Sequence, residues 1–114
     1  MKKIMALIVC IAALAQAGDV FVKSFDNVNL KHRGDYIVFT TRVCIANTGG
    51  EAGHWRTELQ GVDKDGFPIV KQLVDIQTYI PPHSEVKDAD EMFFEADDLD
   101  DVVSWRLVIK PRGY

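Results

Sequence analysis

The alternation of side chains over residues 36–46 constrains the fold more than any other feature of this sequence. Every second position carries a β-branched or aromatic residue: Ile37, Phe39, Thr41, Val43 and Ile45. An extended chain places all of these side chains on one face, and residues of this kind favour strands over helices. We therefore expect a long strand here, with one face packed against a core.

Shorter segments repeat this pattern at spacings near ten residues. Strands are expected at 20–23, 28–31, about 54–62, 67–79, 86–95 and 104–110. Turn-forming residues separate them, at 33–35, 47–50, 63–66 and 80–84, and one helical turn is expected within 96–103. This pattern predicts an all-β chain, a single immunoglobulin-like antiparallel β-sandwich of about seven strands. Two tryptophans, Trp55 and Trp105, are expected to pack between its sheets.

Residues 1–17 have the pattern of a cleavable secretory signal. Two lysines precede the apolar run Ile4–Leu14, and Ala15-Gln16-Ala17 supplies the small residues that signal peptidases read. The apolar run is too short for a stable membrane anchor, which needs about 20 residues. We expect cleavage to leave residues 18–114 as one domain, periplasmic or secreted, with no stable membrane anchor.

The expected mature chain is acidic and contains one cysteine. Loss of Lys2 and Lys3 lowers the net charge from −4 to −6. Nucleic acids and anionic membranes bind proteins through clusters of Lys and Arg. Because the expected mature chain has a net negative charge, we expect no nucleic-acid partner. Because Cys10 lies in the leader, Cys44 is left as a free thiol or as one half of an intermolecular disulfide. The domain must therefore be stabilised by its core.

Three segments resemble the small exported bacterial immunoglobulin-like domains of the FxLYD type. They are Cys44-Ile45-Ala46-Asn47-Thr48-Gly49, Leu59-Gln60-Gly61-Val62-Asp63-Lys64-Asp65-Gly66 and Ile80-Pro81-Pro82-His83-Ser84-Glu85. The resemblance covers roughly residues 36–109. The sequence has Gly61-Val62 where the family has Leu-Tyr, and His83 where Gly is common. The resemblance implies an exported, non-catalytic binding or structural module and supplies no active site.

Nine of the 17 acidic residues lie within residues 85–101, opposed only by Lys87. They are Glu85, Asp88, Asp90, Glu91, Glu95, Asp97, Asp98, Asp100 and Asp101. Three interpretations are open: a solvated segment that keeps the protein soluble, a docking surface for a basic partner, or a weak calcium site, since carboxylate oxygens suit Ca²⁺.

A second candidate metal site is defined by ligand type alone. Blue-copper centres use Cys, His and Met, and this chain has Cys44, His54, His83 and Met92. Those centres gather their ligands in one short loop, whereas here the four residues are spread along the chain. Catalysis by Cys44 is disfavoured, because a strand position by itself supplies neither the helix N-terminus nor the cation that lowers the pKa of a reactive thiol; approach of Arg42 and Arg56 across a pair of strands is left as an open alternative.

We therefore expect an exported, non-catalytic protein-interaction module, in its most specific form an accessory subunit of a cell-envelope assembly, with no cofactor. The residues expected to contact its protein partner are Tyr79, Pro81, Pro82, His83, Asp97, Asp98, Asp100 and Asp101. As an alternative to core packing, Tyr79 beside Ile80-Pro81-Pro82, together with Phe67-Pro68, is expected to form an exposed apolar patch at one end. The competing class is a periplasmic metal- or small-ligand-binding protein, with calcium at residues 85–101 or, less favoured, copper.

Overall fold

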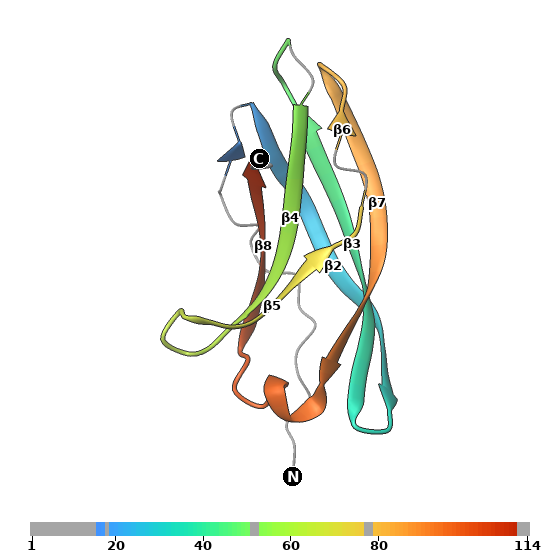
Figure 1. The fold of residues 1–114 in the computed structure, drawn as a ribbon, viewed down its shortest axis with the longest axis vertical. Coiled ribbons are helices and arrows are strands. Elements are labelled where there is room, and N and C mark those ends of the chain that lie inside the picture. The colour runs from blue at the N-terminus through green and yellow to red at the C-terminus, as the bar shows by residue number, and fades with distance from the viewer. Residues whose placement is uncertain (1–15, 18, 51–52, 77–78, 112–114) are drawn as a thin grey trace.

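Figure 1 shows two layers of antiparallel strands in the computed structural model, which describes residues 16–17, 19–50, 53–76 and 79–111. The first sheet has the order β1-β2-β3-β7, from β1 (Gln16–Ala17), β2 (Val20–Arg33), β3 (Tyr36–Asn47) and β7 (Ser84–Glu95). In the second sheet β4 (Gly53–Val62) lies between β5 (Pro68–Val74) and β8 (Ser104–Pro111). The short β6 (Tyr79–Ile80) pairs with the start of β4. The expected immunoglobulin-like β-sandwich is confirmed.

The chain alternates between the two sheets. β2 and β3 form a hairpin in the first sheet, and β4 and β5 form a hairpin in the second. The chain then returns to place β7 beside β3, and crosses again to place β8 beside β4. A single 3₁₀ turn, η1 (Ala96–Leu99), makes this last crossing, where one helical turn was expected.

The β4–β5 hairpin illustrates how the turn residues act. The Asp63 side chain accepts hydrogen bonds from the backbone N–H groups of Asp65 and Phe67, each at 2.9 Å. Gly66 adopts a φ of 86°, a left-handed conformation that glycine adopts without steric cost. The expected turn at residues 63–66 is therefore confirmed.

The core lies between the sheets and is centred on three aromatic rings. Trp105 of β8 packs edge-on against Phe39 of β3 at 5.3 Å between centroids, and Phe94 of β7 lies 5.5 Å from the same indole. Trp105 is 1% exposed, as expected of a residue between the sheets. Trp55 is half-buried and packs against the edge of this core.

Three of the predicted strands have the wrong bounds. The segments 20–23 and 28–31 belong to one continuous strand, β2. Register shifts at Val22/Ser24 and Val28/Lys31 change which side chains face the core without ending the strand. Asn29 adopts a φ of 60° at the second shift, which Asn tolerates better than most residues. The strand expected over 67–79 ends at Val74.

The expected signal segment lies largely outside the described residues, since 1–15 and 18 are not among them. Gln16 and Ala17 form β1 and pair with the first two residues of β2. No helix in the part of the chain that the structure describes is long and apolar enough to cross a membrane.

Candidate functional site

The Tyr79–His83 segment lies at the end of the sandwich where β4 begins and β3 ends (Figure 1). Buried Asn47 holds this segment in place. Its amide nitrogen donates to the carbonyl oxygens of Ile80 and Pro81, each at 3.2 Å, and its amide oxygen accepts from Gly49 N–H at 2.9 Å. The Asn-Thr-Gly segment therefore joins two loops that are distant in sequence.

The candidate contact residues of this loop are exposed. Tyr79 is 47% exposed, and Pro81, Pro82 and His83 also lie at the surface. His83 adopts a φ of 51°, and its N–H donates to Gly49 O at 3.2 Å. The loop is thus ordered by hydrogen bonds and by the buried side chain of Ile80, while its other side chains face solvent.

The second group of candidate contact residues lies at the opposite end of the molecule. Asp97 and Asp98 belong to η1, and Asp100 and Asp101 follow it. All four are exposed, while Leu99 between them is 4% exposed and anchors the turn in the core. The twelve residues of β7 separate the two groups, which at about 3.3 Å per residue is roughly 40 Å. One small partner site cannot include both.

The same geometry overturns the expected apolar patch. Phe67 is 65% exposed and lies at the β4–β5 hairpin, whereas Tyr79 pairs with His54 at the other end of β4. The two aromatic rings therefore belong to different ends of the sandwich. Phe67 and Tyr79 are close in sequence, which suggested that they share an end. The chain runs along the second sheet between them, however, so they lie at opposite ends.

The remaining acidic residues of the 85–101 segment lie along β7, which is an edge strand because it pairs only with β3. Glu85, Glu91 and Glu95 are exposed on the outer face. Asp88 and Asp90 are half-buried and alternate with exposed residues, so they lie on the same side as the core residues Met92 and Phe94, facing the other sheet. The Asp90 carboxylate accepts a hydrogen bond from Asp75 N–H at 2.7 Å, just beyond β5.

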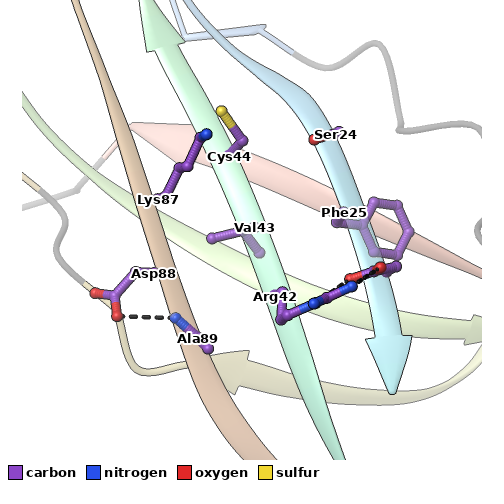
Figure 2. A pocket seen from close by; sticks show the side chains of 9 residues that line it. Ser24, Phe25, Arg42, Val43, Cys44, Lys87, Asp88 and Ala89 are labelled. Carbon is purple, nitrogen blue, oxygen red and sulfur yellow. Dashed lines mark hydrogen bonds and ion pairs between the residues drawn. The ribbon is translucent and has the colours of Figure 1, made fainter.

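A hollow of about 570 Å³ lies on the outer face of the first sheet. Its lining comes from β2, β3 and β7: Ser24, Phe25, Asp26, Arg42, Val43, Cys44, Lys87, Asp88 and Ala89 (Figure 2). Figure 2 shows Cys44 and Lys87 side by side on paired strands. Arg42 crosses the hollow's floor to form an ion pair with Asp26 of β2.

Cys44 has no disulfide partner among the described residues of this chain, and it is 8% exposed. Burial raises the pKa of this thiol, and the nearby carboxylate of Glu85 raises it further. Glu85 Oε1 lies 3.7 Å from the sulfur, and Glu85 also pairs with Lys23 at 2.5 Å. A thiol with a raised pKa is mostly protonated at neutral pH and is a weak nucleophile.

The candidate metal ligands do not converge. Met92 is 0% exposed in the core, whereas Cys44 lies on the opposite face of the same sheet, and His83 lies in the loop before β7. His54 pairs with Tyr79 through its backbone, but its side chain is not among those described. Across the described residues, no group of three or more His, Cys, Asp or Glu side chains could hold a metal ion.

Sequence reasoning missed a third exposed surface, along β5. Phe67, Ile69 and Leu73 are 65%, 41% and 54% exposed. Ile69 and Leu73 alternate with half-buried Val70 and buried Val74, so they face away from the core. Pro68 is a sequence signal for an edge strand and could have indicated this surface. The strand has apolar residues on both faces, however, and such a pattern is typical of a strand buried in the core.

These features define a small immunoglobulin-like β-sandwich with exposed loops and edges. No family model matches the sequence, and no curated protein matches it.

Similar solved structures include a conserved hypothetical protein from Bacillus anthracis, with a TM-score of 0.48 and 13% identity over 79% of this chain and 80% of that chain. A DUF1425 family member from Shewanella sp. has a TM-score of 0.43 and 9% identity over 93% and 97% of the two chains. Campylobacter jejuni cj0090 has a TM-score of 0.36 and 20% identity over 80% and 85%. These similarities assign no activity to this chain.

Proposed function

We propose that this protein is a non-catalytic protein-binding module that acts outside the cytoplasm, as an accessory subunit of a cell-envelope assembly. The location is supported by the signal pattern of residues 1–17, and the module class by the resemblance to exported FxLYD-type domains. One structural observation carries the binding role: the open edge of β5 presents Ile69 and Leu73 to solvent.

An exposed strand edge has a direct consequence for binding. Its backbone N–H and C=O groups are available to another chain, so an edge without protection is a site of association. Apolar side chains beside such an edge add burial of about 25 cal/mol per Å² when a partner covers them. β5 combines both features, since it pairs only with β4 and exposes Ile69 and Leu73 on the outer face.

The two loop surfaces at the ends of the sandwich are further candidate contacts within the same proposal. The Tyr79–His83 loop offers an apolar contact, and Asp97, Asp98, Asp100 and Asp101 offer an electrostatic one. Because they lie at opposite ends, they engage different partners or opposite sides of a large one.

Site-specific photo-cross-linking tests the proposal. A photoreactive amino acid replaces Leu73, Tyr79 or Asp98 in the full chain, produced in its own cells, and exposed Lys31 on the other sheet serves as the control position. We expect a discrete adduct of defined mass from Leu73 that is absent from Lys31. No adduct from any of the three test positions, or the same adducts from Lys31, would contradict the binding function.

A further inference from the structure

The edges of the two sheets are protected to different degrees. β7 carries Asp88 and Asp90 on its inner side and Glu85 and Glu91 on its outer side. Inward-pointing charges prevent the pairing of an additional strand, because a second chain would have to desolvate them. β2, the other long strand at the edge of this sheet, is distorted by two register shifts.

β5 lacks the inward charges and multiple shifts that protect these edges. It is a seven-residue strand with one register shift, near Pro68 at its start. Its outer side chains are Ile69, Lys71 and Leu73, all exposed, while Val70 and Val74 face the core. An added strand on this edge would therefore meet an apolar–basic–apolar row.

The surface around this row is basic, although the protein is acidic. Register and exposure place four cationic side chains on the outer face of the β5-β4-β8 sheet, opposed by one carboxylate, Glu58. The four are Arg56, Lys71, Arg106 and Lys110.

Among the described residues, the direct hydrogen-bond contacts of Glu58 are with Gln60 and Lys110. Its carboxylate accepts from Gln60 at 2.7 Å and lies 3.5 Å from Lys110. Burial alone would raise the pKa of Glu58, but the Gln60 hydrogen bond, the Lys110 charge and, least of these, the Lys71 charge lower it. The row along β5 therefore presents the exposed, positively charged Lys71 between two apolar side chains.

The row disfavours a second copy of this chain as the occupant. Two antiparallel β5 strands centred on Lys71 would align Ile69 with Leu73, which is favourable for the apolar residues. The same register sets two Lys71 side chains directly opposite each other, and like charges in that position are destabilising. The complementary occupant carries a carboxylate where the second copy has a lysine.

We propose, on the basis of the protein-binding function above, that β5 receives an extended segment of a partner protein as an added antiparallel strand. The segment has the pattern apolar–x–acidic–x–apolar. Its carboxylate lies across from Lys71 and its apolar side chains lie across from Ile69 and Leu73, at the spacing of about 5 Å that cross-strand neighbours adopt. Main-chain hydrogen bonds supply affinity, and this row supplies specificity.

The test uses NMR titration of the isotope-labelled protein with two synthetic peptides. One is acetyl-Thr-Val-Thr-Glu-Thr-Leu-Thr-amide, and the other has Lys in place of Glu. We expect the Glu peptide to shift backbone amides of residues 68–74 and to bind about three- to tenfold more tightly than the Lys peptide. Lys71→Glu should reverse this preference, whereas Lys87→Glu, an equal charge change on the opposite sheet, should leave it unchanged.

Three results would overturn the inference. They are the absence of shifts in β5 with either peptide, a preference that Lys71→Glu does not alter, and concentration-dependent broadening of β5 resonances without peptide, which would indicate self-association. A partner cross-linked only from Tyr79 or Asp98 would also reject β5 as the site while leaving the binding function in place. The absence of any cross-linked partner would instead reject the binding function itself.

Discussion

Gly61 packs closely against three side chains of the second layer, and adding one methyl group there should destabilise the fold. A Cβ atom at Gly61 would lie 2.6 Å from Val70 Cγ2, 2.9 Å from Val102 Cγ2 and 3.1 Å from Trp105 Cζ3. Favourable carbon–carbon contacts are about 3.5–4.0 Å. Three neighbours from β5, β8 and the segment before β8 must therefore move together to accept Gly61→Ala.

Two opposing effects set the magnitude. Forcing a methyl group into a packed core costs about 1–3 kcal/mol, whereas replacing a strand glycine by alanine recovers about 0.5–1 kcal/mol of conformational entropy. We expect Gly61→Ala to lower the free energy of unfolding by about 1–2 kcal/mol. For a domain of this size, each kcal/mol corresponds to a decrease in Tm of about 4–8 °C.

Urea unfolding followed by tryptophan fluorescence measures this effect, since Trp105 lies at the contact. Gly50→Ala is the matched control, because a Cβ at Gly50 has no atom within 4 Å; its stability should stay within about 0.5 kcal/mol of the parent. In a Val70→Ala background the closest contact is absent, so Gly61→Ala should cost less there. An equal cost in both backgrounds would refute the argument from crowding.

Three further predictions concern the loop end, the thiol and the acids. Asn47→Ala leaves the buried Ile80 carbonyl and the part-buried Pro81 carbonyl without this donor and should lower the free energy of unfolding by about 1–3 kcal/mol in the same urea assay; unchanged stability would show that water replaces the amide. Cys44 should react with a thiol reagent more slowly than in urea-unfolded protein, with a pH midpoint above the ordinary value, since burial and Glu85 raise its pKa. Glu85→Gln should lower that midpoint, and a midpoint that stays fixed would contradict the role of the Glu85 charge. Millimolar calcium should leave the Tm unchanged, because no group of the described acids converges; a rise reversed by chelator would favour the calcium-binding alternative.

The strands could be predicted because their alternation is a local property of the sequence. Ile37, Phe39 and Val43 all face the core as expected. Side chains two residues apart in a strand lie on the same face, so the alternating apolar residues must all lie on one side of the sheet. β2 could not be bounded in the same way. A bulge resets the alternation without ending the strand, so a sequence window that spans Asn29 looks like the space between two strands.

The relative positions of the candidate contacts were beyond sequence reasoning. Whether Tyr79 and Phe67 share an end depends on the direction in which β5 leaves its hairpin and on how far the chain travels before β6. Local patterns contain neither quantity. The same limit applies to Cys44 and Met92, whose opposite faces follow from strand register but whose separation along the sheet follows from the pairing of β3 with β7.

The acidic segment shows how one compositional feature can serve two physical roles. Composition presents residues 85–101 as a single cluster, but the structure assigns five of the nine acids to the β7 edge and four to η1 and the turn after it. Acids along β7 oppose the addition of a strand there, which directs any strand addition to the other sheet. On that sheet, Lys71 between Ile69 and Leu73 repels a second copy of this chain but attracts an acidic segment. The distribution of charge over the two edges therefore favours one kind of partner at β5, and the reversal of peptide preference by Lys71→Glu measures that selectivity directly.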